Sequence, residues 1–180
     1  IILLHKNFKY EEGRSLIAEF CAITKPEMPR TKQQILFWKA SIMKYEKKPL
    51  SEVLQTYYDA FYCTVPGNID LKEWIFQREE GMIAKNIGTC LYEMGEIDRA
   101  VQWYELLYAS MQKNRKQNIL MHRCEHIMLG GYAELLGNLK LHRQAMEIDE
   151  ELIKEVNTAV NIDILQYFLY DWVWNVKKLV

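Results

Sequence analysis

The sequence predicts an all-α protein built from antiparallel pairs of helices. Apolar residues recur at intervals of three and four along most of the chain, which is the spacing of one helical face. The stretch 30–48, for example, places Ile35, Trp38, Ile42 and Tyr45 on a single stripe. Glycine and proline number only eight and four, too few for an all-β protein with many tight turns. No segment has the pattern of a convincing strand.

The helices can be followed in order along the chain. Pro49 ends one helix and opens the next, because proline is tolerated in a first helical turn but not inside a helix. A clear break follows at residues 64–70, where Pro66 and Gly67 interrupt the apolar pattern. The expected helices occupy residues 30–48, 49–63, 80–95, 96–114, 116–137, 143–156 and 161–180.

Length and composition fit one globular domain spanning residues 1–180, since 49% of the residues are hydrophobic and 26% are charged. The 23 basic and 24 acidic residues nearly cancel, which argues against a surface built to bind nucleic acid phosphates. No apolar run approaches the ~20 residues needed to span a bilayer, so no membrane partner is expected.

The four cysteines are widely spaced and form no C-x-x-C motif. Each of them, Cys21, Cys63, Cys90 and Cys124, lies in an apolar helical context, where a free thiol behaves as a small hydrophobe. A reduced protein of the cytoplasm is therefore favoured over a disulfide scaffold. Cys90 is expected to be a buried thiol rather than a reactive one.

The helix pairs repeat. When Tyr45 is aligned with Tyr92, Ser41 falls on Gly88, and Tyr57 falls on Tyr104. The same alignment places Val53 on Ala100 and Lys48 on Gly95. The small residue (Ser41, Gly88) marks where a first helix must approach its partner closely. We expect Val53 and Ala100 to pack into that gap, with the aromatic residue one turn later.

A third copy follows. Gly130 and Gly137 reproduce the seven-residue spacing of Gly88 and Gly95. Ala145 then corresponds to Ala100, but only after three extra residues in the turn.

The segment 86–107, "NIGTCLYEMGEIDRAVQWYELL", resembles the tetratricopeptide repeat. That family has a small residue, a turn glycine, an alanine and then an aromatic at the places of Gly88, Gly95, Ala100 and Tyr104. The resemblance implies a right-handed superhelix of stacked antiparallel helix pairs. The copies here recur every 45 to 47 residues, longer than the usual ~34, and the terminal units lack the consensus.

In such a stack the first helix of each pair lines a concave surface. On that surface Asn86 is of interest, because its amide can both donate to and accept from an extended peptide backbone. Lys39 and Lys85 are candidates to meet a peptide carboxylate. The alternatives are that the apolar stripe is core and that Asn86 is merely solvated. The candidate peptide-binding residues are Trp38, Lys39, Ile42, Tyr45, Lys85, Asn86, Thr89, Tyr92 and Met128.

Over nearly its whole length the chain resembles the C-terminal regulatory domain of the Rgg/PlcR-type bacterial transcription regulators. The cues are the long repeats, the segment 57–88 between repeat pairs, and the sequence "GEIDRAVQWYELL". The resemblance implies a helix-turn-helix DNA-binding domain before Ile1, homodimerisation through the C-terminal helices, and control by a short signalling peptide, as in quorum sensing. Asn86 is the residue that best matches a contact to the peptide backbone.

Two features leave alternatives open. Trp172 and Trp174 lie in an aromatic-rich terminal helix that must be covered, and they are candidate dimer contacts. That helix would otherwise simply cap the stack. For the whole chain, the alternative is a repeat scaffold that binds another protein and has no DNA-binding domain.

One motif suggests an enzyme. The stretch "HRCEH" fits H-x-x-E-H, in which His122 and His126 would hold zinc and Glu125 would act as base. No separate segment supplies a recognisable third ligand, and three fixed positions in five residues arise easily by chance. We therefore expect ordinary histidines, no metal, no cofactor and no catalytic residues. The sequence also lacks G-x-S-x-G and phosphate-binding glycine loops.

Overall fold

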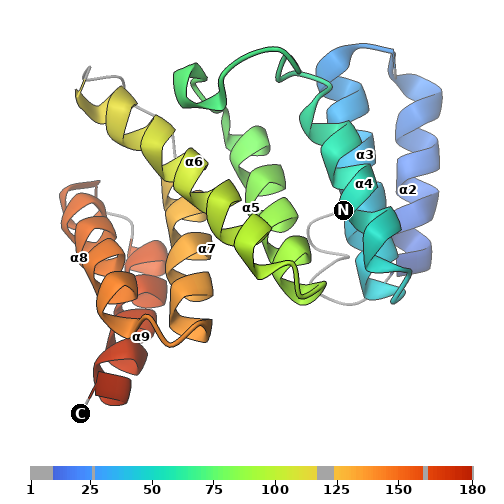
Figure 1. Ribbon diagram of the computed structural model, residues 1–180. Coiled ribbons are helices and arrows are strands. Elements are labelled where there is room, and N and C mark those ends of the chain that lie inside the picture. Colours follow the sequence, from blue (N-terminus) through green and yellow to red (C-terminus); the bar gives the residue numbers. More distant parts are fainter. Residues whose placement is uncertain (1–9, 26, 117–123, 160–161, 180) are drawn as a thin grey trace.

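The computed structural model describes residues 10–25, 27–116, 124–159 and 162–179 (Figure 1). These ranges contain helices and the turns and loops that join them, without a strand, so the prediction of an all-α fold is confirmed for them. The helices are α2 (Tyr10–Ile23), α3 (Pro29–Tyr45), α4 (Leu50–Phe61), the 3-10 helix η1 (Leu71–Glu73), α5 (Arg78–Glu93), α6 (Ile97–Lys116), α7 (Cys124–Asn138), α8 (His142–Ala159) and α9 (Ile162–Leu179).

The helix α2 was not expected from the sequence. Its apolar side chains are only partly covered, with Leu16 38% and Ile23 82% exposed. Glu11 and Glu12 in its first turn complement the helix dipole. Gly13 faces α3, where a Cβ would lie 3.5 Å from the side chain of Ile42.

Consecutive helices pack against one another in pairs (Figure 1). The helix α3 packs on α2 and α4, α5 on α4 and α6, and α7 on α6 and α8, while α9 covers α8. In addition α5 and α7 pack directly on each other although α6 separates them in sequence. The first helices of the second and third pairs therefore lie side by side.

Three helices end in the same backbone motif. The residues that follow α3, α5 and α7, namely Lys47, Gly95 and Lys140, have φ angles of 57°, 79° and 63°. In each case this residue donates its N–H to the carbonyl three residues earlier, and the next residue donates to the carbonyl five residues before itself. This is the Schellman arrangement, which satisfies the last helical carbonyls.

The shared motif corrects the alignment of the repeats. Lys47, not Lys48, is the structural equivalent of Gly95, and in the third copy the equivalent is Lys140 rather than Gly137. Gly137 lies inside α7. The three extra residues of the third copy therefore lengthen its first helix instead of its turn.

Close approach within the pairs occurs where the sequence predicts it, but a different residue fills the gap. A Cβ on Gly88 would lie 2.3 Å from Cε2 of Tyr104, so the Tyr104 ring lies directly against the backbone of α5. The hydroxyl of Tyr104 donates to the carbonyl of Lys85 at 3.0 Å. In the first pair, the hydroxyl groups of Ser41 and Tyr57 are hydrogen-bonded to each other at 3.2 Å. The aromatic residue, rather than Val53 or Ala100, makes the close contact.

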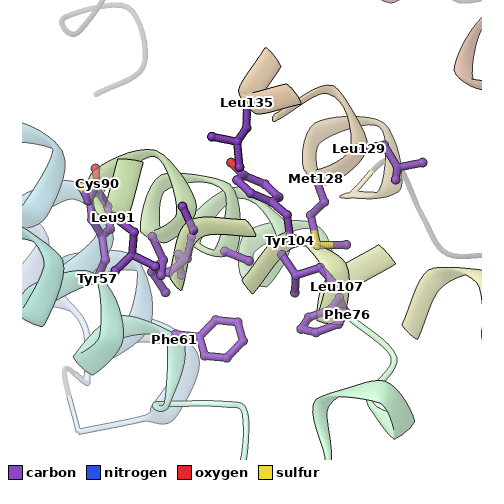
Figure 2. Close-up of a cluster of buried hydrophobic side chains, with 14 of the residues drawn as sticks. Tyr57, Phe61, Phe76, Cys90, Leu91, Tyr104, Leu107, Met128, Leu129 and Leu135 are labelled. Carbon is purple, nitrogen blue, oxygen red and sulfur yellow. The ribbon is translucent and has the colours of Figure 1, made fainter. Parts of the chain in front are cut away.

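The core runs through the middle of the chain (Figure 2). Tyr57, Phe61 and Leu91 lie in one part of it, and Tyr104 and Leu107 in the next, all almost completely buried. Cys90 is 0% exposed, which confirms the prediction of a buried thiol. No helix within the described ranges is both long enough and apolar enough to cross a membrane.

The long connection between α4 and α5, residues 62–77, belongs to this core. Phe76 is 1% exposed and Leu71 is 9% exposed. Ser110 of α6 donates its hydroxyl to the carbonyl of Trp74 at 2.9 Å. The connection is therefore bound to α6, and its Thr64 lies between Gln33 of α3 and Glu80 of α5.

Candidate functional site: a cleft between α3 and α5

A cleft of about 600 Å³ lies between α3 and α5. Helix α3 contributes Trp38 and Tyr45 to it, and α5 contributes Met82 and Asn86. Tyr57 of α4 also borders the cleft although it is only 1% exposed, so it forms the floor. The cleft combines an aromatic lining with a few polar groups, as ligand sites commonly do. Its remaining lining residues are Gln34, Phe37, Ser41, Lys44, Arg78 and Glu79.

The two sides of α5 differ in how closely a neighbouring helix packs on them. Where α7 packs on α5, Gly131 lets the helices approach so closely that a Cβ there would meet the Lys85 side chain at 2.8 Å. Only about 20 Å³ remains open beside that contact. On the other side of α5, Phe37, Trp38 and Met82 line the open cleft towards α3.

Asn86 faces the cleft in a fixed orientation. Its Nδ2 donates to the carbonyl of Met82, one turn earlier in α5, at 2.8 Å. Its Oδ1 accepts no hydrogen bond from the residues that the structure describes. The side chain therefore offers an acceptor, and its primary use would be to receive an N–H group from a bound backbone.

The floor of the cleft is neutral. Burial raises the pKa of Tyr57 well above its ordinary value, and the hydrogen bond with Ser41 opposes that rise only in part. The Tyr57 hydroxyl thus stays protonated and is shared with Ser41 at 3.2 Å. An uncharged, aromatic floor favours an apolar side chain of a ligand.

Charged groups lie at the two ends of the cleft. Lys44 of α3 pairs with Glu93 of α5 at 2.9 Å at the end where both helices terminate. Arg78 and Glu79 border the opposite end, in the first turn of α5. Because the charges at each end have opposite signs, the lining carries no strong net charge.

Three of the predicted peptide-binding residues, Trp38, Tyr45 and Asn86, meet in this cleft. Lys39 is exposed but does not border it. Ile42 is 8% exposed and faces Gly13 of α2, so its placement on the binding surface was wrong.

Met128 must also be removed from the predicted site. It is 0% exposed and lies in the core beside Tyr104 and Leu107 (Figure 2). Its assignment rested on the register of the third repeat, which the turn geometry corrects.

The other predicted residues lie on the far side of the same helix. Thr89 and Tyr92 border the narrow space between α5 and α7. Lys85 lies over Gly131 and pairs with Glu134 at 3.6 Å. These three residues are not brought together with Trp38 and Tyr45.

Sequence reasoning missed several lining residues. Ser41 and Tyr57 were expected only to pack helices α3 and α4 together. In the structure they also border the cleft. Phe37 lies four residues before Ser41 on the same face of α3, so the helical spacing could have identified it. Nothing in the sequence singled out Arg78.

The two tryptophans of α9 pack against the chain itself. Trp172 donates its Nε1–H to Glu150 of α8 at 3.3 Å. The ring of Trp174 meets His142 edge to face at 5.5 Å, and Lys178 lies over it at 5.4 Å. Trp174 nevertheless remains 40% exposed. These contacts fit a capping helix, and a dimer contact stays a prediction.

The "HRCEH" motif lies only partly in the described chain. His122 falls outside the described residues, whereas His126 is half-buried on α7. Within the described ranges, no three His, Cys, Asp or Glu side chains converge as a metal site would require. Cys21, Cys63 and Cys90 are free thiols.

Comparison of the chain with protein-family models, with curated proteins and with solved structures gives no match. The cleft between α3 and α5 is therefore the basis for assigning a function.

Proposed function

We propose that this chain is the peptide-sensing and dimerisation domain of a bacterial transcription regulator, acting in the cytoplasm. The observation that carries the proposal is the cleft of about 600 Å³ in which Trp38, Tyr45 and Asn86 meet. The helices would form a tetratricopeptide-like right-handed superhelix, with the first helices of the pairs on its concave side. The domain binds and does not catalyse.

The dimensions of the cleft suggest the length of the ligand. On α3 the lining runs from Gln34 to Tyr45, eleven residue steps, or about 16 Å at a rise of 1.5 Å per residue. An extended chain advances about 3.3 Å per residue, so about five peptide residues fit along the cleft. An apolar side chain of the peptide would lie over Tyr57, and a backbone N–H would donate to Oδ1 of Asn86.

The dimer would form through the last helix. Helix α9 exposes a set of large apolar side chains, and a second copy is the partner that the proposal requires. The DNA-binding domain would precede the chain. Among the side chains of α9 that the structure describes, the exposed large apolar ones are Leu169, Val173, Trp174 and Leu179.

Native mass spectrometry of the purified chain tests the peptide site. A synthetic pool of mixed-sequence pentapeptides is added, and the retained masses are compared between the wild type and Asn86→Ala. We expect the wild type to retain a subset of pentapeptides and the variant to retain it at least about tenfold less, the loss of one hydrogen bond in an apolar site.

The matched control is Lys39→Ala, which changes an exposed residue of α3 that does not border the cleft. Equal retention by all three proteins, or none by the wild type, would contradict the peptide site. Selection of long segments only, with pentapeptides ignored, would favour a scaffold that binds parts of other proteins.

A further inference from the structure

Two polar links join α3 to α5 at opposite ends of the cleft. The first, here named the buried tie, consists of Gln33, Thr64 and Glu80. Gln33 donates its Nε2–H to the Thr64 hydroxyl at 2.6 Å, and Thr64 donates its single proton to Oε1 of Glu80 at 2.7 Å. The second, the exposed ion pair, joins Lys44 to Glu93 at 2.9 Å.

The buried tie is built to hold. Gln33 and Glu80 are each only 3% exposed. The other oxygen of Glu80 accepts from the indole of Trp74 at 3.0 Å and from the backbone N–H of Gln77 at 2.8 Å. Hydrogen bonds to a carboxylate are among the stronger ones, and a buried partner left unsatisfied is costly. Gln33 and Glu80 are thus shielded from water, whereas Thr64 between them is half-buried.

The exposed ion pair differs in each of these respects. The Lys44 and Glu93 side chains are 25% and 37% exposed. Exposed pairs of this kind contribute about 0–1 kcal/mol and weaken as salt increases. Water and ions readily take the place of either partner.

The packing of the helices leaves the cleft dependent on these links. The main contacts of α3 are with α2 and α4, and those of α5 are with α4, α6 and α7. Since α4 supports both helices from beneath, their separation across the cleft is set by the floor and by the links at the two ends.

We propose that the cleft opens as a hinge, with the buried tie as its fixed end and the exposed ion pair as its releasable end. Rupture of the Lys44–Glu93 pair lets the C-terminal halves of α3 and α5 separate, while Gln33, Thr64 and Glu80 keep the N-terminal halves together. The role of this hinge rests on the proposed function: the open cleft would admit the peptide, and the closed cleft would retain it.

Distances between paired spin labels test the hinge in the full chain without any ligand. In one protein, p-acetylphenylalanine replaces Lys48 and Asp98, two exposed residues at the releasable end, and carries the spin labels. This chemistry does not require the native cysteines to be removed. A second labelled protein carries them at Lys32 and Arg78, exposed residues at the fixed end. Double electron–electron resonance gives the distance distribution for each pair.

For Glu93→Gln we expect the Lys48–Asp98 distribution to broaden and move to longer distance, while the Lys32–Arg78 distribution stays unchanged. In the wild type, 1 M salt should have the same effect, because the Debye length falls to about 3 Å. The control is Glu134→Gln, which removes the comparable Lys85–Glu134 pair between helices that pack directly. It should change neither distribution.

Thr64→Val tests the fixed end, since it keeps the shape of the side chain and removes the hydroxyl from the tie. We expect the Lys32–Arg78 distribution to broaden, and Thr64→Ser, which retains a hydroxyl, to restore it. If Thr64→Val does not fold, the Glu93→Gln comparison decides alone. Unchanged distances at the Lys48–Asp98 end, or equal opening at both ends, would overturn the hinge. Neither result depends on whether a peptide binds.

Discussion

A single methyl group is enough to disturb the contact between α5 and α6. The ring of Tyr104 lies against Gly88, and its hydroxyl is fixed by the carbonyl of Lys85 at 3.0 Å. The ring also stacks on Tyr132 of α7 at 5.6 Å. Because the ring is 2% exposed, stacked on Tyr132 and fixed through its hydroxyl, it has little room to move aside.

We expect Gly88→Ala to lower the free energy of unfolding by about 1–3 kcal/mol, the usual cost of overpacking a well-filled core. The better helix propensity of alanine offsets up to about 1 kcal/mol of this. Urea denaturation measures the change. The control is Gly67→Ala, because a Cβ there meets nothing within 4 Å. Equal stability of Gly88→Ala and the wild type would contradict the close packing.

Cys90 gives the core a pH dependence in the alkaline range. Burial raises the pKa of Cys90 from 9.0 to about 11, with smaller and opposing effects of Lys44 and Glu93. The unfolded chain thus loses the thiol proton first. This contribution to stability is complete below pH 9 and is lost as the pH rises to about 11.

We expect Cys90→Ala to reduce the loss of unfolding free energy across that pH window by about 2–3 kcal/mol, because one pKa unit corresponds to about 1.4 kcal/mol. Urea midpoints measured at both ends of the window give the difference. Cys63→Ala, which removes a thiol that is only half-buried, should change the slope less. An unaltered slope in Cys90→Ala would show that the buried thiol does not titrate there.

At the scale of the element, the backbone conformation at the ends of α3, α5 and α7 is repeated, whereas the glycine is not. Lys47, Gly95 and Lys140 occupy the same left-handed position, yet one alone is glycine. An L-residue in that conformation is strained by roughly 1–2 kcal/mol. At both lysines the same conformation allows the two hydrogen bonds that satisfy the last helical carbonyls, which offsets part of the strain.

We expect Lys140→Gly to raise the free energy of unfolding by up to about 1 kcal/mol. The substitution relieves backbone strain in the folded state, but the greater conformational freedom of glycine in the unfolded chain offsets part of this gain. The reverse change, Gly95→Ala, should lower it by about 1 kcal/mol, since its Cβ would meet no neighbour and the φ of 79° alone opposes it. Thermal denaturation compares them. A destabilised Lys140→Gly would mean that the lysine side chain itself is needed.

These helix ends also explain how far elements can be predicted from sequence. The helices from α3 to α9 were expected because their apolar spacing of three and four is regular, and they differ from expectation mainly at their ends. Helix α2 was not expected, although Leu16, Phe20 and Ile23 have the same spacing of four and three. The turn after α7 lies where the sequence predicts it, within residues 137–142, but Lys140 rather than Gly137 adopts the left-handed conformation.

For the molecule as a whole, part of the cleft could be predicted from the sequence and part could not. Trp38 and Tyr45 lie together because they share one face of α3, and the packing of α3 and α5 on α4 brings Asn86 of α5 to the same cleft. The apolar pattern does not distinguish a face covered by another helix from one that remains open. The pattern therefore could not reveal that Ile42 and Met128, which lie on equally apolar stripes, are buried.

The proposed dimer makes a prediction at this scale. Val173 is 42% exposed on α9, and a charged side chain there would have to be desolvated in a dimer interface. We expect the wild type to be a dimer by light scattering after size exclusion, and Val173→Glu to be a monomer. Leu16→Glu, at an apolar residue of α2 with 38% exposure, should leave the dimer intact. A monomeric wild type would contradict the interface.

The buried connection between α4 and α5 has a consequence for folding. In an ordinary repeat array each unit interacts with its neighbours through one interface, and units can unfold from the ends. Here Leu71 and Phe76 insert the linking segment into the core shared by the first two pairs, and Trp74 is anchored to α6. The helices α3 to α6 therefore form one cooperative block, and loss of its first pair would expose the apolar surface of the second.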